Sequence, residues 1–319
     1  MKRIGVLTGG GDAAGMNPAL RAVVRRARGL GAEVIGIQRG WEGLAEGDFR
    51  KLTSRDVSGI IDRGGTILRT FRYPEFATDE GTAPVGKTIE KMKLDGLVII
   101  GGDGSFRGGN KLTRSFGLPV VGVPATIDND IPGTDISIGF DTALNTAIEA
   151  VDKVRDTATS HGRIFVIEVM GRSYGLLAAQ TAIATGAEEV LLPEVPYDID
   201  DLCKRISSGY RRGKQHAIII VAEGAGKAPH VAFEIKERLK RGVRMVVLGH
   251  TQRGGSPSGY DRILASRLGH RATDLLFAGE HGVMVGIVGN KIKTSSLDKK
   301  SKLSGKAVLS DLRLMEDLI

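Results

Sequence analysis

Short apolar runs alternate with amphipathic stretches along almost the whole of this 319-residue chain. The runs are rich in Val and Ile and are bounded by Gly or Pro, which is typical of buried β-strands. We predict strands at 3–8, 32–37, 66–71, 96–101, 119–124, 163–170, 189–193, 216–224, 244–250 and 282–289.

The stretches between these runs have a helical period. In residues 17–30 the spacing places Leu20, Val23, Val24 and Ala27 on one face, and residues 140–158 repeat apolar positions in the same way. Alternating strands and helices predict an α/β fold with parallel sheets covered by helices on both faces. The length favours two domains. The basic segment 291–306 is the part least expected to be ordered.

Composition narrows the function classes. The net charge of +8 is compatible with nucleic-acid binding, but aromatics are only 5% and no nucleic-acid recognition motif is present, so we expect no nucleic-acid partner. No apolar run approaches the roughly 20 residues that a membrane-spanning helix needs. The amino terminus reaches glycine too soon for a signal peptide, and Cys203 is the single cysteine. We therefore expect a cytoplasmic protein without a membrane segment.

Two strands end in glycine-rich turns. The loop GGDGS, after residue 100, combines glycines with the carboxylate of Asp103, and Mg²⁺ prefers carboxylate and phosphate oxygens. The turn TGGGDAAGMN precedes a helix, whose free N–H groups can hold an anion, and we place Gly11 beside phosphate. These motifs predict a metal-bound polyphosphate. A plain strand-to-helix turn remains the alternative for each, because neither motif is a Walker loop or a complete dinucleotide fingerprint.

Two aspartates follow the strand at 119–124, in TIDNDIPGTD. Phosphorylation of a hydroxyl requires a group that takes its proton, and aspartate is the usual base in kinases. Asp128 and Asp130 are therefore candidates, since a local turn would account for only one of them. Arg72, in TFRYPEF, is a candidate clamp for the transferred charge, with a surface ion pair as the alternative.

Later strands begin or end with charged side chains. The planar guanidinium of arginine suits bidentate contacts with phosphate, and a glutamate can accept a hydrogen bond from a sugar hydroxyl. The candidates are Arg163, Arg172, Glu223, Arg244, His250 and Arg253. Each alone also has an ordinary explanation as a surface arginine, a histidine at the core edge or an ion-paired glutamate.

The chain resembles the bacterial ATP-dependent 6-phosphofructokinases in a series of motifs with the family's order and approximate spacing. These motifs are GGGDAAGMN, RGGTILRT, GGDGS, TIDNDIPGTD, GFDTALNTAI, VIEVMGR, VAEG and LGHTQRGGSP. The resemblance implies two doubly wound, Rossmann-like domains with the active site in the cleft between them. The larger, ATP-binding domain would comprise 1–139 and 252–303, and the smaller, fructose 6-phosphate-binding domain 140–251 and 304–319.

The resemblance also implies the reaction, which moves the γ-phosphoryl group of ATP to the 1-hydroxyl of fructose 6-phosphate with Mg²⁺. Asp128 would be the base. The other implied catalytic residues are Arg72, Thr126, Asp130 and Arg172. The nucleotide would contact Gly11, Arg72, Tyr73, Gly102, Asp103, Gly104 and Ser105, with Asp103 on the metal. The sugar phosphate would contact Thr126, Ile127, Asp128, Arg163, Met170, Gly171, Arg172, Glu223, Arg244, His250 and Arg253.

Two further properties follow from the resemblance. Arg163 and Arg244 would reach the substrate of a neighbouring subunit, so a homotetramer is expected. An effector site for ADP or phosphoenolpyruvate would contain Arg21, Arg25, Arg155, Gly186, Glu188, Arg212, Lys214, Gln215 and His216, with Glu188 on Mg²⁺. Gln215 stands where relatives commonly have lysine, which predicts weaker regulation. The other departures from common family residues are Trp41 and Ser173–Tyr174.

Two positions favour ATP as the donor. Gly104 stands where pyrophosphate-dependent relatives carry aspartate, whose charge would repel the α-phosphate of ATP. Those relatives also tend to have lysine at the position of Ala125. A pyrophosphate-dependent phosphotransferase remains the alternative enzyme. A non-catalytic sugar-phosphate sensor is the alternative from another class, and it would be expected to have lost Asp103 or Asp128.

Overall fold

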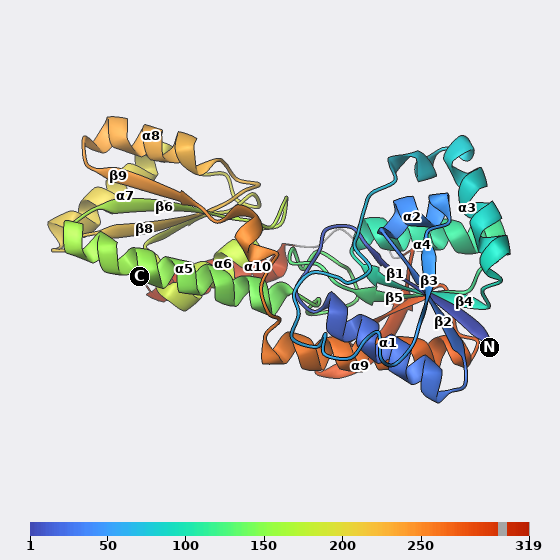
Figure 1. The fold of residues 1–319 in the computed structure, drawn as a ribbon. Helices are drawn as coiled ribbons and strands as arrows, with labels where there is room; N and C mark the ends of the chain where they lie inside the picture. Colours follow the sequence, from blue (N-terminus) through green and yellow to red (C-terminus); the bar gives the residue numbers. More distant parts are fainter. Residues whose placement is uncertain (299–304, 319) are drawn as a thin grey trace. The chain divides into compact units, whose positions relative to one another are not determined.

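The computed structural model describes residues 1–298 and 305–318, which form two compact units (Figure 1). Unit 1 contains residues 1–126, 130–142 and 253–298, and unit 2 contains residues 127–129, 143–252 and 305–318. Each unit has its own sheet with helices on both faces, so the predicted α/β fold class is confirmed. The predicted boundary at 303/304 lies outside the described residues. No described helix is both long and apolar enough to cross a membrane.

Unit 1 is built on a seven-stranded sheet. Its order is β11 (Lys291–Ser296), β10 (Val283–Val288), β5 (Val120–Pro124), β4 (Gly96–Gly101), β1 (Arg3–Gly9), β2 (Glu33–Ile37) and β3 (Phe49–Leu52). Neighbours from β10 to β2 pair in parallel, whereas β11 and β3 pair antiparallel at the two edges. The parallel strands are almost wholly buried, which explains their near-continuous apolar sequence.

Helices cover both faces of this sheet (Figure 1). One face carries α1 (Met16–Gly29) and α9 (Gly259–Phe277), and the other carries α2 (Gly40–Glu46), α3 (Asp79–Met92) and α4 (Asp103–Phe116). The predicted apolar face of α1 is buried as expected. Strands β1 and β4 are neighbours, yet the helices that follow them lie on opposite faces. Such a switch point opens a crevice at the carboxyl ends of the strands, where ligands bind in this fold class.

Unit 2 is built on a four-stranded parallel sheet. Its order is β7 (Glu189–Leu191), β8 (Ala217–Ala222), β6 (Ile164–Val169) and β9 (Val243–Val247). Helices α7 (Ile199–Arg211) and α8 (Ala228–Leu239) cover one face and close over an apolar core. Helices α5 (Phe140–His161), α6 (Leu176–Thr185) and α10 (Lys306–Leu318) lie on the other side of the sheet (Figure 1).

One predicted strand is wrong. Residues 66–71 form no strand, and Phe71 makes only an isolated bridge with Gly40. The segment is held instead by side chains, because Asn17 Oδ1 accepts a hydrogen bond from Ile67 N at 2.8 Å and the Asn17 amide donates to two carbonyls just upstream. Only Leu68 of this segment is buried, so its β-branched sequence reflects a tethered loop rather than sheet pairing.

The prediction for the basic segment 291–306 is also wrong over its first part. Residues 291–296 form β11, an edge strand that pairs antiparallel with β10 and exposes most of its side chains. Lysines on an exposed edge discourage pairing with another chain, so a basic sequence is compatible with a strand here. Residues 299–304 of this segment lie outside the described residues. Strand β3 was not predicted, and it too is a mostly exposed edge strand.

Candidate active site

The two glycine turns lie at the same edge of the unit 1 sheet. Strands β1 and β4 are parallel neighbours with Gly9 opposite Gly101, so the residues that follow both strands meet at this edge. A Cβ on Gly101 would come within 2.5 Å of the Gly9 carbonyl oxygen, which only glycine avoids. The two turns therefore present closely spaced backbone. The second turn leads directly into the amino end of α4.

The loop GGDGS has one exposed carboxylate. Asp103 begins α4, and its side chain is about half exposed and lies 3.2 Å from the Arg107 guanidinium. Gly104 is exposed, and a Cβ there would meet only Arg107 Nη2 at 3.9 Å. Ser105 Oγ is buried beside Gly9 and has no hydrogen-bond partner among the described residues. The loop thus combines open backbone, a carboxylate and an unsatisfied hydroxyl.

Two arginines that are predicted to bind ligands, Arg253 and Arg72, are connected to the first glycine turn in different ways. Arg253 packs on Gly11, and its Nη1 donates to the Asp12 carbonyl oxygen at 3.1 Å. The segment leading to Arg72 is tied to the same turn, because Thr70 Oγ1 donates to the Gly10 carbonyl oxygen at 2.7 Å. Arg72 itself is exposed. Tyr73, which follows it, packs against the unit 1 core.

The aspartate loop leaves the adjacent strand, β5, at the same edge. Residues 125 and 138 form a bridge at its base, and Ser137 Oγ donates to the Thr126 carbonyl oxygen at 2.7 Å. Within the loop Thr126, Ile127 and Asp128 are buried, whereas Asp130 is partly exposed. A buried carboxylate such as Asp128, only 3% exposed, needs compensating partners and is seldom placed without a role.

Arg172 is a cation close to Asp128, and both residues belong to unit 2. Arg172 Nε is 3.9 Å from Asp128 Oδ2. The loop that carries Arg172 is fixed by Glu223, whose Oε1 accepts hydrogen bonds from the backbone N–H of Gly171 at 3.1 Å and of Arg172 at 2.6 Å. Arg172 has a positive φ of 55°, a conformation that such tethering sustains.

Three neighbouring strands of unit 2 end beside one another. Met170 follows β6, Glu223 follows β8, and His250 lies in the short 3₁₀ helix Gly249–Gln252 after β9. The structure adds Gln252, which sequence reasoning missed. Its buried Oε1 accepts a hydrogen bond from Met170 N at 2.9 Å and so joins two of these strand ends. The only sequence signal for it was its place inside LGHTQRGG.

Arg163 and Arg244 lie elsewhere in unit 2. Arg163 precedes β6, whereas Arg172 follows it, so the strand's whole length of roughly 20 Å separates them. Arg244 pairs in register with Phe165, close to the same amino end of the sheet. Among the described contacts, the structure therefore does not bring these two arginines to the Arg172 and Glu223 cluster of their own chain.

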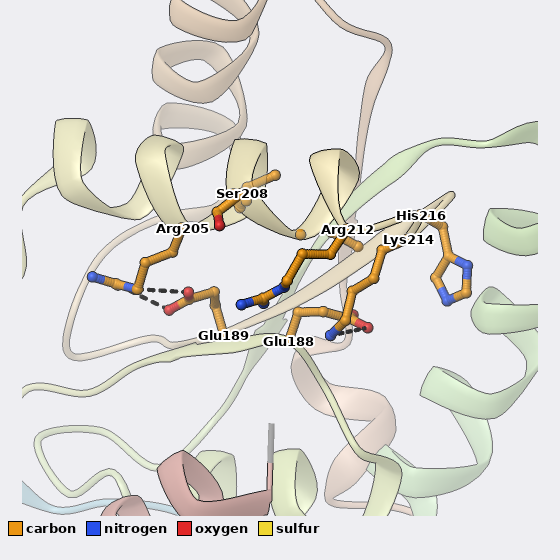
Figure 2. Close-up of a pocket in the computed structure, with 10 residues that line it drawn as sticks. Glu188, Glu189, Arg205, Ser208, Arg212, Lys214 and His216 are labelled. Atoms are coloured by element: carbon orange, nitrogen blue, oxygen red, sulfur yellow. Dashed lines mark hydrogen bonds and ion pairs between the residues drawn. The ribbon is translucent and has the colours of Figure 1, made fainter.

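Unit 2 also contains a separate cavity of about 200 Å³, part of the predicted effector site (Figure 2). Glu188, Arg212, Lys214 and His216 line it. Glu188 Oε2 accepts from Ile218 N at 2.7 Å, and its Oε1 lies 3.6 Å from Lys214 Nζ. The Arg212 side chain points along the cavity and makes no hydrogen bond or ion pair with another described residue.

The remaining effector candidates are only partly gathered. Gly186 is the C-cap of α6, and the Arg155 guanidinium donates to the carbonyl oxygen of Thr185, the last residue of that helix. Gln215 is exposed and does not line the cavity. Arg21 and Arg25 lie on α1 in unit 1, where partial burial and then the charge of Arg25 lower the pKa of Arg21. Sequence reasoning missed the other lining residues, among them Glu189 and Arg205, which form an ion pair at 2.7 Å, and Ser208.

Among residues 1–298 and 305–318, no three His, Cys, Asp or Glu side chains cluster closely enough to hold a metal ion. Asp103 and Glu188 therefore belong to no cluster of three or more such side chains in this part of the chain. Such an arrangement suits Mg²⁺ that is held by one or two carboxylates and otherwise by phosphate oxygens and water.

Two units, each with parallel strands at the centre of its sheet and helices on both faces, define a doubly wound α/β protein. Residues 3–276 match the phosphofructokinase family model. A relative from Halalkalibacterium halodurans, named ATP-dependent 6-phosphofructokinase, is 54% identical across 100% of this chain and 99% of its own. One of the same name from Natranaerobius thermophilus is 55% identical across 92% and 91%. The chain belongs to the phosphofructokinase family.

Solved structures agree with this assignment. Phosphofructokinase from Saccharomyces cerevisiae matches 99% of this chain with a TM-score of 0.86 and 34% identity, and the match spans 46% of the yeast chain. Our chain thus spans less than half the length of that relative. A pyrophosphate-dependent phosphofructokinase from Marinobacter aquaeolei has a TM-score of 0.85 over 99% of this chain and 91% of its own. Its identity is 21%, so this likeness shows the shared fold alone.

Proposed function

We propose that the chain is an ATP-dependent 6-phosphofructokinase. It transfers the γ-phosphoryl group of ATP to the 1-hydroxyl of fructose 6-phosphate and yields ADP and fructose 1,6-bisphosphate. The observation that carries this proposal is the identity of 54% with an enzyme of that name over essentially the full length of both chains. The proposal includes a cytoplasmic location, where both substrates are available.

Unit 1 binds the nucleotide in this proposal. Gly11 and the backbone of Gly102–Ser105 approach the phosphates, Ser105 Oγ gains the partner that it lacks, and Arg72 and Tyr73 flank the nucleotide. The exposed Asp103 carboxylate would hold Mg²⁺, which neutralises phosphate charge when bound. The amino end of α4 adds a favourable dipole for the anionic ligand.

Asp128 acts as the general base and takes the proton of the sugar 1-hydroxyl. Its burial supports this role, because a carboxylate shielded from water is a stronger acceptor than an exposed one. Arg172, whose Nε lies 3.9 Å from Asp128 Oδ2, is placed to stabilise the negative charge of the transferred phosphoryl group. Thr126 and Asp130 complete the loop beside it.

Unit 2 binds fructose 6-phosphate. Met170, Gly171, Glu223 and His250, which end neighbouring strands, surround the sugar, with Ile127 and Arg253 contributing from the two adjoining loops. Arg163 and Arg244 serve the substrate phosphate of a neighbouring subunit in a homotetramer. Their position at the opposite end of the unit 2 sheet from Arg172 supports this assignment, since they cannot reach a substrate held at their own strand ends.

The cavity in Figure 2 is the effector site of the proposal. ADP or phosphoenolpyruvate presents phosphate to Arg212, Lys214 and His216, and Glu188 contributes a contact to Mg²⁺. Arg155, Gly186 and Gln215 are further residues of this proposal. Arg21 and Arg25, on α1 of unit 1, are proposed as additional phosphate-binding cations. The guanidinium of Arg212 has no partner among the described residues and so supports an anionic ligand, whereas Arg205, Lys214 and His216 each have a carboxylate or hydroxyl partner.

A pyrophosphate-dependent phosphotransferase is the second candidate, favoured only by likeness of fold. Two residues of this chain count against it. Gly104 leaves the nucleotide side of the loop open, and Ala125 is buried without the charge that a lysine would supply.

Replacing the proposed base, Asp128, by a neutral side chain tests the proposed reaction directly. We expect Asp128→Asn to retain binding of fructose 6-phosphate by calorimetry while turnover with ATP falls about 10²- to 10⁴-fold, the usual effect of losing a general base. The matched control is Asp135→Asn in the same loop, whose exposed carboxylate accepts from Gly289 N. It should stay within about twofold of the parent. Comparable turnover in both variants would remove Asp128 from the reaction.

A further inference from the structure

Asp261 is a fully buried carboxylate that none of the roles above uses. It lies in the first turn of α9 with an exposure of 0%. Its Oδ1 accepts a hydrogen bond from Gly139 N at 2.8 Å, and its Oδ2 accepts from both the backbone N–H and the hydroxyl of Thr142, the former at 2.8 Å. Three donors on one buried carboxylate make a specific, charge-assisted anchor.

Side chains at the starts of α9 and α5 accept hydrogen bonds from each other's backbone N–H groups. Ser258, Gly259, Tyr260 and Asp261 have the spacing of a capping box, in which the last side chain reaches back to the backbone N–H of the first residue. Here Ser258 Oγ accepts from Asp261 N at 3.1 Å, but Ser258 N donates at 3.0 Å to Thr142 Oγ1 of α5. The carboxylate of Asp261 is thereby released to cap α5.

Helix α5 needs this outside cap. The residue before it is Gly139, which has no side chain to accept the free N–H groups of the first turn. Gly139 has a φ of 99°, and a Cβ there would come within 2.6 Å of the Ala13 Cβ atom, so a capping Ser or Asp is excluded at this position. The first turn of α5 therefore depends on Asp261.

Gly139 is also the last residue of the aspartate loop. Its neighbour Ile138 bridges Ala125 at the base of that loop, and a Cβ on Gly15 would come within 2.4 Å of Ile138 Cγ2. The same hypothetical Cβ would lie 3.6 Å from the Asp261 Cβ atom. The glycine turn, the aspartate loop and the start of α9 thus pack together around a single carboxylate.

We propose that Asp261 is a positioning residue for phosphoryl transfer, whose carboxylate fixes the loop of Asp128 against the glycine turn that receives the nucleotide. This inference rests on the proposed function, in which Asp128 is the base. Removal of the carboxylate leaves buried N–H groups of Gly139 and Thr142 unpaired, and the loop relaxes to satisfy them elsewhere. A misplacement of about 1 Å is enough to lower turnover on the order of 10²-fold.

Asp261→Asn tests the proposal, because an amide keeps the size of the side chain but presents an N–H group to one of the donors. We expect kcat to fall roughly 10- to 100-fold, with KM for ATP and for fructose 6-phosphate changed less than about threefold. The matched control is Asp274→Asn on the same helix, which removes a partly exposed ion pair with Arg26 and should leave kcat unchanged. Calorimetric titration with fructose 6-phosphate counts the binding-competent sites in each variant.

A merely structural role would give fewer competent sites with a normal kcat per site, and that result would overturn the proposal. If Asp261→Asn does not fold, Thr142→Val and Thr142→Ser decide instead. The serine variant keeps the hydroxyl that Asp261 and Ser258 share and should preserve kcat, whereas the valine variant should lower it. Equal kcat values for the two would contradict the proposal. Full activity of Asp128→Asn would overturn the role of Asp128 itself, while an inactive Asp128→Asn beside a normal Asp261→Asn overturns only the positioning role.

Discussion

At the scale of single residues, the proposed preference for ATP can be tested at Gly104. A side chain at this position has room, because its Cβ would have only Arg107 Nη2 within 4 Å. We therefore expect Gly104→Ala to bind ATP almost normally. Gly104→Asp should raise KM for ATP about tenfold or more, since juxtaposed like charges cost several kcal/mol.

Steady-state kinetics with ATP as the varied substrate distinguishes charge from size at this position. A similar rise in KM for the alanine and aspartate variants would mean that bulk alone disturbs the loop. Unchanged kinetics for the aspartate variant would place Gly104 away from the nucleotide.

The site residues that sequence could predict are those inside long motifs, such as Asp103, Asp128 and Glu223. Each is a charged residue in a glycine-rich or proline-flanked strand end, a context that its own neighbours reveal. Gln252 lies inside LGHTQRGGSP but is uncharged, and Asp261 lies outside the motifs. Their partners Met170 and Gly139 lie 82 and 122 residues away, so only the folded chain shows what these side chains hold.

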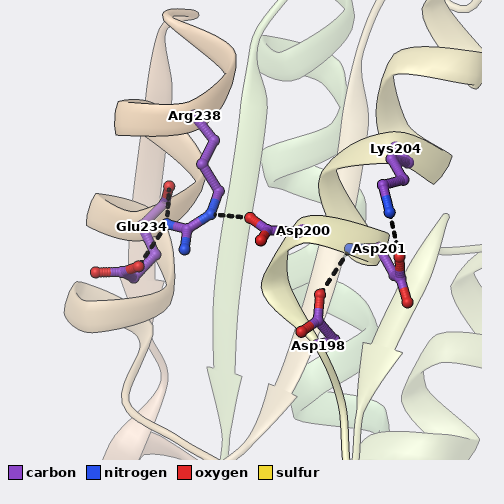
Figure 3. A network of polar contacts seen from close by, with 6 residues as sticks. All are labelled: Asp198, Asp200, Asp201, Lys204, Glu234 and Arg238. Atoms are coloured by element: carbon purple, nitrogen blue, oxygen red, sulfur yellow. Dashed lines mark hydrogen bonds and ion pairs between the residues drawn. The ribbon is translucent and has the colours of Figure 1, made fainter.

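At the scale of elements, helix α8 has one buried and one exposed polar contact that involve glutamates, and the two should contribute differently to stability. Glu168 is buried on β6, and its carboxylate accepts from Ala228 N at 2.8 Å at the start of the helix. Glu234, on the helix itself, pairs with the exposed Arg238, which also reaches Asp200 of α7 (Figure 3). Burial makes the first contact the more valuable one, because solvent screens the second.

We expect Glu168→Gln to lower the free energy of unfolding by about 1–3 kcal/mol, the cost of leaving a buried donor poorly paired. Glu234→Gln should change it by no more than about 1 kcal/mol. Urea unfolding followed by circular dichroism measures both variants. A larger loss for Glu234→Gln would reverse the ranking and show that the surface network in Figure 3, rather than the buried cap, secures α8.

Strands were predictable where they are buried. The runs at β1, β4, β5, β6 and β8 are apolar because both faces of a covered parallel sheet exclude water. Strands β3 and β11 escaped prediction because they are exposed edge strands with basic residues and no apolar run. The segment 66–71 misled in the other direction, because its β-branched residues belong to a loop that is held by side-chain hydrogen bonds such as that from Ile67 N to Asn17 Oδ1.

At the scale of the whole molecule, the proposed regulation assigns a role to residues in each of the two units. If ADP or phosphoenolpyruvate binds at the effector cavity, it should shift fructose 6-phosphate half-saturation by roughly fivefold, the low end of typical coupling energies, because Gln215 supplies no charge. Arg25→Ala combined with Lys214→Ala should abolish the shift and preserve maximal turnover.

The matched control for this pair is Arg28→Ala with Lys204→Ala, which removes two exposed cations from α1 and α7. Saturation curves for fructose 6-phosphate, with and without each effector, measure all three proteins. A shift that survives in the Arg25 and Lys214 double variant, or that disappears in the control, would remove the effector role from this cavity.

The most direct test of the central claim is an initial-rate assay of fructose 1,6-bisphosphate formation from fructose 6-phosphate, Mg²⁺ and either ATP or pyrophosphate. We predict rapid formation with ATP and, at the same concentration, no formation above background with pyrophosphate, because the loop at Gly104 is open and Ala125 carries no charge. Turnover with pyrophosphate and none with ATP would contradict the assigned donor, and no product with either would contradict the assigned reaction.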